Sequence, residues 1–567
     1  MRSSASSALP QSIWVADSAI SGARSASSRR QRREEDQMRI IITAKGAAAK
    51  AGVLVTPVFS DQLDAPYLRE ADSKSGGRIA ALRAIGEGTG SRYSCTLTSA
   101  GRLPADHLLL VGAGPRADFG RQELQRWASA ATRRLAGRKI TRLAIDATGI
   151  IAALTSTSPA LRAEGGASFG AGLSANATKQ SDAAVIAVDF IVRGVIDGSF
   201  HEGVGGKSII EAQPAALTVL EIIVPSGTDL AAASEGARRA EIIASGVVRT
   251  RRWSNYPANE MPPLGIAEEA RERARAVGLR ATIITAAQLQ RMGAGMLIAV
   301  GKGSKNPPCL VVLSGGKPGA KDPLGRRLAM VGKGVCFDTG GISLKPPAEM
   351  EEMKHDKNGA IAVLEAAATI ARLDPGRPIH AVAACVENMP GGNATRPGDV
   401  VTALNGKRVE VTNTDAEGRL ILGDALHYAE RELGATHLVD VATLTGIAYS
   451  TFGGEIAATC GTDAAFLDEF HLAARRAGEV YWPYPLAEAY MKNMSTWSAD
   501  FQNAGTREAS LIRSGLFLRE FVTVPWVHLD IAGTAYRRSV APFAGRGSTG
   551  AAHTSLVELA MGGGVRR

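Results

Sequence analysis

A chain of 567 residues is too long for one ordinary domain, and its length predicts two or three. Apolar residues make up 45% of the chain and charged residues 21%, as in typical globular proteins, and no run approaches the roughly 20 uncharged apolar residues of a membrane span. The net charge of +10 comes without a zinc-finger, RNP or basic-zipper pattern, so the sequence argues against both a membrane protein and a dedicated nucleic-acid-binding protein.

The first half of the chain predicts an extension followed by an α/β domain. Residues 1–37 are rich in serine and arginine and show no apolar period, so we expect a disordered extension. From residue 38 to 205, apolar runs alternate with helical stretches, which favours an N-terminal α/β domain. Its predicted strands are 39–43, 107–112 and 183–190, and its predicted helix is 121–135.

A linker and a second α/β domain follow. The glycine-rich segment 201–206 is a predicted connection, and the linker 206–254 contains one strand and a long helix at 231–249. Prolines at 257, 262 and 263 end that helix. For residues 255–567 we predict a largely parallel sheet with buried strands at 328–331, 379–386 and 437–442, and a helix at 360–373.

The five cysteines are scattered and form no CxxC pair. An odd, low count in a chain of this length is typical of reduced thiols in a cytosolic protein, not of a disulfide framework. We therefore expect a cytoplasmic location.

Charged residues gather at the predicted end of the strand that begins at 328. Lys333, Asp338, Lys345 and Asp356 lie in or just after glycine-rich backbone there, and in open α/β sheets ligands bind at the carboxyl ends of strands. A second acidic cluster follows at Asp415 and Glu417. These two residues are two positions apart, so an extended backbone would point both carboxylates the same way.

The four carboxylates would repel one another strongly in one pocket unless cations neutralised them. Two divalent metals about 3.5–4 Å apart, with bridging carboxylates and a shared water, would solve this, and oxygen ligands suit Mg, Mn or Zn. Spacing alone leaves another interpretation open, because a D-x-E pair is also common on solvated strands and Lys333 could be a surface lysine.

Longer motifs distinguish the two interpretations. The octapeptide NTDAEGRL at 413–420 is identical to the signature of the leucine aminopeptidase (cytosol aminopeptidase) family, and GKGVCFDTGGISLKP at 332–346 with MKHD at 353–356 resembles the metal-binding and catalytic region of that family. DVATLTG at 440–446, WSADFQN at 497–503 and WVHLDIAG at 526–533 agree in the same order. The resemblance covers residue 255 to the C-terminus by motif, and the N-terminal domain by general architecture.

The resemblance implies a fold and a metal centre. The fold would be a smaller, macro-like N-terminal α/β domain joined by a long helix to a larger catalytic α/β domain with a mixed, mainly parallel sheet. Two divalent metals, Mn or Zn with Mg and Co as alternatives, would be bound per subunit. One would be bound by Asp338, Asp415 and Glu417, and the other by Lys333, Asp338, Asp356 and Glu417.

The resemblance also implies a reaction. A metal-bridging hydroxide would attack the first peptide bond, Lys345 would stabilise the oxyanion, and Arg419 would hold a bicarbonate-like anion that acts as general base. The substrate-binding residues would be Met353 at the first side chain, with Asn413, Thr443, Leu444 and Gly446. The substrates would be peptides beginning with leucine or another apolar residue, and the subunits would form a homohexamer.

One departure and two rival functions accompany this interpretation. Lys357-Asn358 stands where the family has an apolar residue followed by a small one, which puts a cation next to Asp356 in the chain. A two-metal phosphoesterase is one rival, but such enzymes usually mix several histidines with aspartates, and this cluster has only His355. DNA binding is the other, because the net charge is positive and some bacterial members of the resembled family bind DNA.

Overall fold

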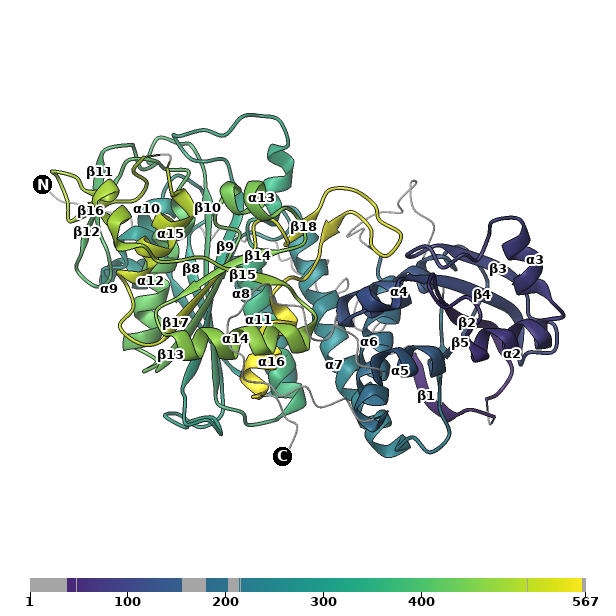
Figure 1. Cartoon of the computed structure of the whole chain (residues 1–567). Helices are drawn as coiled ribbons and strands as arrows, with labels where there is room; N and C mark the ends of the chain where they lie inside the picture. Colours follow the sequence, from purple (N-terminus) through teal and green to yellow (C-terminus); the bar gives the residue numbers. More distant parts are fainter. Residues whose placement is uncertain are drawn as a thin grey trace, which may run out of the picture.

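The computed structural model describes residues 38–562 except 47, 156–179, 202–213, 215 and 507. Within these residues the chain forms two α/β parts joined by the 26-residue helix α7 (Leu230–Asn255), as Figure 1 shows. This confirms the predicted fold class. The expected extension 1–37 and most of the expected connection 201–206 lie outside the described residues. The domain limits 38–205, 206–254 and 255–567 stay predictions.

The N-terminal part is built on a six-stranded sheet in the order β1-β6-β5-β2-β4-β3, in which only β3 is antiparallel to its neighbour. The predicted strands 39–43 and 107–112 and the predicted helix 121–135 are confirmed. The elements are β1 (Arg39–Ala44), β2 (Ala51–Phe59), β3 (Cys95–Ser99), β4 (Ala105–Gly114), β5 (Arg142–Asp146), β6 (Val219–Val224), α2 (Pro66–Ser75), α3 (Arg78–Ala84), η1 (Arg116–Asp118), α4 (Arg121–Arg133), α5 (Thr148–Thr155) and α6 (Gln180–Gly198).

The predicted strand 183–190 is wrong, because these residues belong to helix α6. Most of α6 is buried, since it packs between α4 and α7 and so has apolar residues on nearly every side. A helix buried all round loses the polar face that would reveal its period, and a short apolar run then cannot be distinguished from a buried strand.

Helix α7 begins and ends as its sequence dictates. The carboxylate of Asp229 caps its first turn by accepting hydrogen bonds from the amides of Ala231 and Ala232. It ends at Asn255, two residues before Pro257, because the residue before a proline is driven out of helical geometry. The predicted helix 231–249 is thus confirmed, and it extends six residues further.

The larger part is built on an eight-stranded mixed sheet in the order β15-β14-β17-β13-β9-β10-β8-β7. The inner strands β17, β13, β9 and β10 run parallel, and β14, β8 and β7 make antiparallel pairs. The strands are β7 (Arg280–Thr285), β8 (Cys309–Gly315), β9 (Leu328–Asp338), β10 (Ile379–Asn388), β13 (His437–Ala442), β14 (Ala457–Gly461), β15 (Tyr481–Pro483) and β17 (Trp526–Asp530). The three strands predicted in this region are therefore confirmed.

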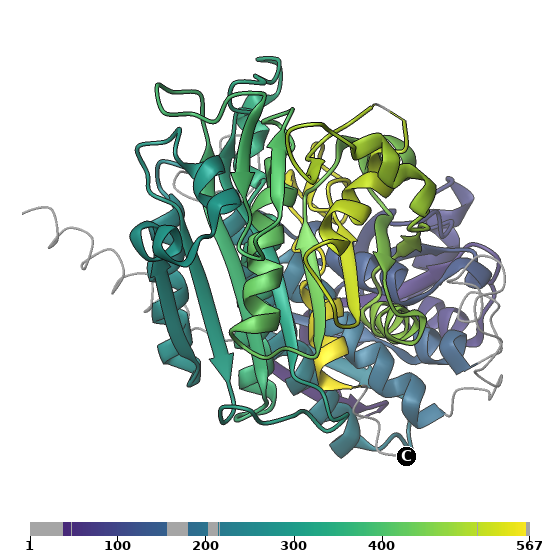
Figure 2. The same cartoon turned by 90° about the vertical axis from the view of Figure 1, so that its left-hand side faces the viewer.

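Helices pack against this sheet, as Figure 2 shows. Two apolar cores result, one that includes residues of α11 and one that includes residues of α12. The predicted helix 360–373 is confirmed as α11. The helices are α8 (Pro263–Val277), α9 (Ala286–Met292), α10 (Gly295–Gly301), η3 (Met350–His355), α11 (Asn358–Leu373), α12 (Glu417–Arg431), α13 (Gly446–Phe452), α14 (Ala464–Ala477), η4 (Glu488–Met494), α15 (Ser510–Arg519) and α16 (His553–Met561).

Two small sheets complete the larger part. One contains β11 (Asp399–Thr402), β12 (Arg408–Val411) and β16 (Phe501–Gln502), and the other pairs β18 (Tyr536–Arg537) with β19 (Gly547–Ser548). None of the helices in the described ranges combines the length and the apolar character that crossing a bilayer would require.

Candidate metal centre

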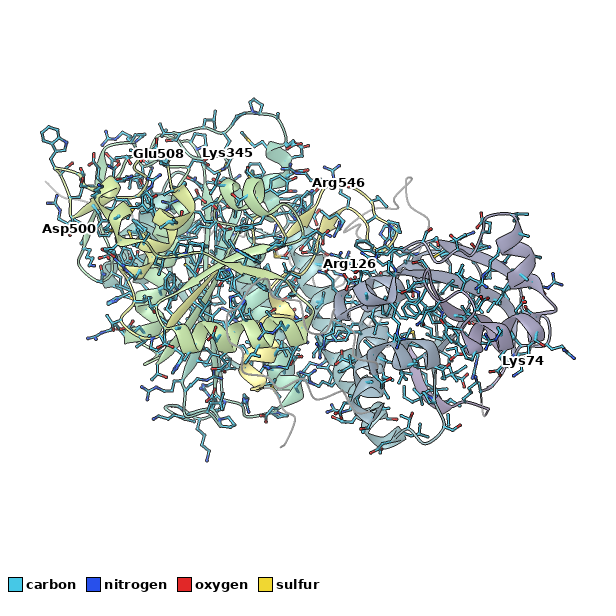
Figure 3. All side chains as sticks on the ribbon, in the orientation of Figure 1. Lys74, Arg126, Lys345, Asp500, Glu508 and Arg546 are labelled. Atoms are coloured by element: carbon cyan, nitrogen blue, oxygen red, sulfur yellow. The ribbon has the colours of Figure 1, made fainter. Side chains whose placement is uncertain are left out.

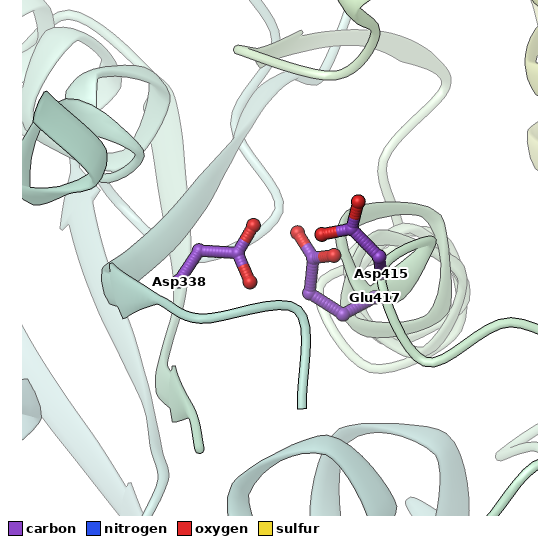
Figure 4. Close-up of side chains that lie close together, drawn as sticks. All are labelled: Asp338, Asp415 and Glu417. Atoms are coloured by element: carbon purple, nitrogen blue, oxygen red, sulfur yellow. The ribbon is translucent and has the colours of Figure 1, made fainter. Parts of the chain in front are cut away.

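The acidic residues expected from the sequence converge at the carboxyl end of β9. Asp338 is the last residue of β9, Asp356 follows η3, and Glu417 is the first residue of α12. One ligand atom from each of Asp338, Asp415 and Glu417 lies within 4.8 Å of the others, and Figure 4 shows the three carboxylates turned toward one another.

The expectation of an extended backbone through Asp415 and Glu417 is wrong. Asp415 lies in a turn and Glu417 opens a helix, so the turn rather than strand alternation brings the two carboxylates to one side. Asn413 shapes this turn, because its side-chain oxygen accepts a hydrogen bond of 2.9 Å from the amide of Asp415.

Two lysines lie between the carboxylates. Nζ of Lys333 is 2.9 Å from Oδ1 of Asp356 and 2.8 Å from Oε1 of Glu417, and it donates to the carbonyl of Thr443 at 2.9 Å. Nζ of Lys345 is 2.9 Å from Oδ2 of Asp338 and also pairs with Asp415. Figure 3 labels Lys345 in the catalytic part. When all four carboxylates are ionised, they exceed the two ammonium groups by two negative charges, which suits the binding of further cations.

Burial and mutual repulsion set the protonation of this cluster. Burial raises the pKa of Asp356, Glu417 and Asp415, and the charge of Asp338 raises each further. Burial by itself lowers the pKa of Lys333 and Lys345, but the surrounding carboxylates outweigh it and the pKa of both lies above its usual value. A metal that takes Lys333 as a ligand must therefore displace its proton.

Two glycines allow the backbone to close around the cluster. A Cβ on Gly418 would lie 2.8 Å from the Lys333 side chain, including its Nζ. Gly340 has a φ of +86°, and a Cβ there would lie 2.4 Å from the carbonyl of Ser343. Side chains at these positions would push apart the β9 loop and the start of α12.

Sequence reasoning missed two polar residues that hold the site in shape. Nδ2 of Asn388 donates to Oδ1 of Asp338 at 2.8 Å and to the carbonyl of Thr414 at 3.0 Å. The carboxylate of Asp530 accepts from the amide of Leu444 at 3.1 Å and from the hydroxyl of Thr445 at 2.6 Å. Both residues end buried strands that belong to the β9 sheet, and that position is the signal that could have identified them.

A cavity of about 430 Å³ opens onto the cluster. It is lined by ten of the twelve expected site residues: Lys333, Asp338, Lys345, Met353, Asp356, Asp415, Glu417, Thr443, Leu444 and Gly446. Asn413 and Arg419 are not among the described residues that line it. Arg419 is buried beside it, where its two terminal nitrogens donate to the carbonyl of Asn503 at 2.7 Å and to Oγ of Ser514 at 2.8 Å. Burial lowers its pKa to about 10.

Lys357, the departure from the resembled family, does not line this cavity in the described structure. Its side chain is fully buried, and Nζ donates to the carbonyl of Tyr256 at 2.7 Å and to that of Lys354. Burial lowers its pKa to about 8. Lys357 thus ties η3 to the end of α7.

Comparisons with known proteins match both parts of the chain to the same family. The model of the cytosol aminopeptidase family, catalytic domain, matches residues 248–557, and that of the N-terminal domain of the same family matches residues 55–165. A probable cytosol aminopeptidase of Solibacter usitatus is 37% identical over 515 residues, which are 90% of this chain and 96% of the relative.

Two solved structures are also similar. A leucine aminopeptidase variant of tomato has a TM-score of 0.78 and 28% identity, over 93% of this chain and 96% of the tomato chain. The bottromycin maturation enzyme BotP in complex with Mn has a TM-score of 0.70 and 29% identity, over 90% of this chain and 99% of that chain.

Proposed function

The chain belongs to the cytosol aminopeptidase family and is a metal-dependent exopeptidase. On that premise, we propose that it uses two divalent metals to remove leucine and other apolar residues from the N-termini of peptides. One observation supports the two-metal centre above all. Four carboxylates and two lysines converge at the edge of a cavity of about 430 Å³ and carry an excess of negative charge.

The donor set fits two divalent ions. The first would take Asp338, Asp415 with its main-chain carbonyl, and Glu417. The second would take Lys333, Asp338, Asp356 and Glu417, so that Asp338 and Glu417 bridge. In support, Oδ2 of Asp356 is buried and has no hydrogen-bond partner among the described residues. Carboxylate oxygens with one amine favour Mn or Zn, with Mg and Co as alternatives. Bound there, the metals would lower the pKa of a shared water and polarise the first carbonyl.

The side chains of this protein supply the remaining functions. Lys345 stabilises the negative charge that develops on the carbonyl oxygen, because carboxylates keep its ammonium protonated at the cavity edge. Thr443, Leu444 and Gly446 bind the peptide backbone, and Met353 contacts the first side chain. Asn413 contributes to substrate binding by shaping the turn that contains Asp415.

We assign Arg419 to a bicarbonate-like anion that takes up the proton released in the reaction. Its terminal nitrogens are anchored, and its buried Nε has no hydrogen-bond partner within the described ranges. Arg419 follows Glu417 by two residues on α12, so the anion would be held near the proposed metal ligands. Turnover that rises with added bicarbonate in the native protein but not in Arg419→Gln would support this role, and equal behaviour of the two would remove it.

Hydrolysis of leucine p-nitroanilide tests the function directly. We expect turnover that is lost after chelation and restored by Mn or Zn. Alanine, glutamate and arginine anilides measured in parallel test the apolar preference. A protein that hydrolyses leucine anilide equally well before and after metal removal would contradict the two-metal proposal, and hydrolysis of phosphoesters instead of the anilide would support the rival phosphoesterase.

Three further properties are proposed with the family and need their own measurements. For a homohexamer, light scattering would give a particle mass six times the chain mass of 59.1 kDa. Cell fractionation that recovers the protein in the cytoplasmic fraction would support a cytoplasmic location. Secondary DNA binding is favoured only by the net charge of +10, and a salt-dependent gel shift of the Asp338→Ala protein would reveal it apart from catalysis.

A further inference from the structure

One wall of the cavity is a hairpin that connects the two parts of the molecule. We call residues 536–548, from β18 to β19, the bridging hairpin. Tyr536 and Arg537 line the cavity from its first strand, and Arg538 lines it just after that strand. Figure 1 shows this hairpin leaving the catalytic part toward the N-terminal part, beside α4.

The tip of the hairpin is held by the N-terminal part. The carbonyl of Phe543 accepts a hydrogen bond of 2.7 Å from Oγ of Ser129, and its ring meets that of Tyr93 edge-on at 5.1 Å. The guanidinium carbons of Arg126 and Arg537 lie 4.7 and 5.0 Å from the centre of the Phe543 ring. The hairpin is therefore clamped onto α4 by apolar, aromatic and cation–π contacts.

The base of the hairpin is held by η3, the segment that carries Met353. Glu352 pairs with Arg538 at 2.9 Å and with Arg546 at 3.2 Å, and the rings of His355 and Tyr536 are 4.0 Å apart. Figure 3 labels Arg546 on the hairpin and Arg126 on the N-terminal side of it. The wall formed by the hairpin thus adjoins the part of the cavity proposed for the first side chain.

A second charge pair lies at this wall. Glu455, in the turn after α13, lines the cavity and a smaller one of about 120 Å³ that Arg126 also lines. Arg126 pairs closely with Glu455 across the domain boundary, whereas Arg537 is 3.7 Å from it. The Glu455 side chain is 51% exposed, so its charge faces both solvent and cavity. Without Arg126, only Arg537 at 3.7 Å would remain near this carboxylate, and its less neutralised charge would disfavour an apolar side chain and attract a cationic one.

We propose that Arg126 is a specificity-determining residue: by neutralising Glu455 from the N-terminal domain, it favours peptides with an uncharged apolar first residue over peptides with a basic one. This inference rests on the proposed aminopeptidase function. Arg126 acts through Glu455 and the bridging hairpin, and it is not among the described residues that line the large cavity. The N-terminal domain therefore takes part in substrate selection.

The test compares kcat/KM for leucine and arginine p-nitroanilides, which differ only in the first residue. In Arg126→Gln we expect the leucine-to-arginine ratio to fall about threefold to fivefold, the size typical of a half-exposed charge. The change should shrink in 0.5 M salt, because salt screens exposed charges. Arg134→Gln, which removes an exposed arginine at the end of the same helix, should keep the native ratio.

A double-mutant cycle separates charge from folding. In a Glu455→Gln background the Arg126→Gln change should leave the ratio unaltered, since the carboxylate it would expose is gone. Equal losses for both substrates in Arg126→Gln, or the same fall in ratio with and without Glu455, would overturn the proposal. Leucine anilide turnover by the native protein tests the proposed function separately, because only the change in ratio depends on Arg126.

Discussion

Lys345 is the more exposed lysine of the acidic cluster, with 22% of its side chain exposed against 3% for Lys333. Lys333 contacts Asp356, Glu417 and the carbonyl of Thr443, so its exchange would disturb two proposed metal ligands. Lys345, by contrast, has one face toward the cavity. This difference in exposure fits the proposed roles, in which Lys333 is a metal ligand and Lys345 acts on the substrate.

Replacing Lys345 by alanine tests this division. Removing one preorganised donor to a developing oxyanion typically lowers kcat about 100- to 1,000-fold, and we expect a loss of this size in Lys345→Ala. The bound metal, measured by elemental analysis, should stay at the native level because the carboxylate ligands remain. Native kcat in the variant would remove Lys345 from the reaction.

Asn388 holds one of the proposed metal ligands in place, and it is not among the described residues that line the large cavity. Its amide fixes Asp338 against the turn that holds Asp415, and losing such a support typically weakens metal affinity about 10- to 100-fold. We expect a weakening in that range for Asn388→Ala, measured by competition with a chelating dye. Unchanged Mn affinity would show that Asp338 is held well enough by the amide of Gly340.

At the residue scale, most of the residues expected from the sequence line the cavity, and two kinds of sequence signal identified them. Composition and spacing pointed to charged residues after a buried strand, and only the family motif assigned their roles. The spacing of Asp415 and Glu417 suggested an extended backbone, but a turn followed by the start of a helix can also place two carboxylates on the same side. Asn388 was missed because one amide after a buried strand has no motif of its own.

Among the elements, α7 is the one that both parts share. It packs against α6 of the N-terminal part and against α11 of the catalytic part. Gly246 in α7 faces the hydrogen bond of 2.9 Å between Thr369 on α11 and His553 on α16. Close approach of three helices depends on this glycine.

Gly246→Ala therefore reverses the usual effect of this substitution. In an exposed helix, alanine is more stable than glycine by about 1 kcal/mol. Here the new methyl group would lie 2.2 Å from Oγ1 of Thr369 and 2.5 Å from Nε2 of His553, so we expect a lower Tm. A raised Tm in thermal unfolding would mean that the helices can separate at little cost.

At the element scale, the strand run beginning at Leu328 was predicted because it ends in glycine-rich backbone. The helix at 360–373 was predicted although α11 is buried on every side, because its apolar run is longer than an ordinary strand. Segment 183–190 failed because its neighbours α4 and α7 lie on two sides of α6, and the sequence around it gives no sign of either contact. The information that was missing is tertiary, not local.

On the scale of the whole molecule, a buried ionic cluster joins the two parts. Glu558 on the C-terminal helix α16 is 2.7 Å from Arg239 on α7 and 3.6 Å from Arg193 on α6. Burial alone would raise the pKa of Glu558, but these arginines outweigh it and lower the pKa below its usual value. Burial raises the pKa of Asp189 nearby, so Glu558 is the principal anion of the cluster.

Glu558→Gln should destabilise the native protein at neutral pH by about 2 kcal/mol, because the buried Arg193 and the partly exposed Arg239 each lose one of two anionic partners and keep Asp189. A lowered folded-state pKa contributes stability that is present above about pH 4.5 and lost as the pH falls through the folded value. The difference between native and variant in urea unfolding should therefore shrink below pH 4.5. An equal difference at pH 7 and at acid pH would contradict the assignment.

The placement of β9 also has a consequence for the newly made chain. Every proposed metal ligand has been synthesised by Glu417, but β9 pairs with β13, and β13 pairs with β17, which ends only at Asp530. Until those strands arrive, the sheet that aligns the ligands is incomplete. A complete sheet can therefore align the proposed ligands only after residue 530 has been made.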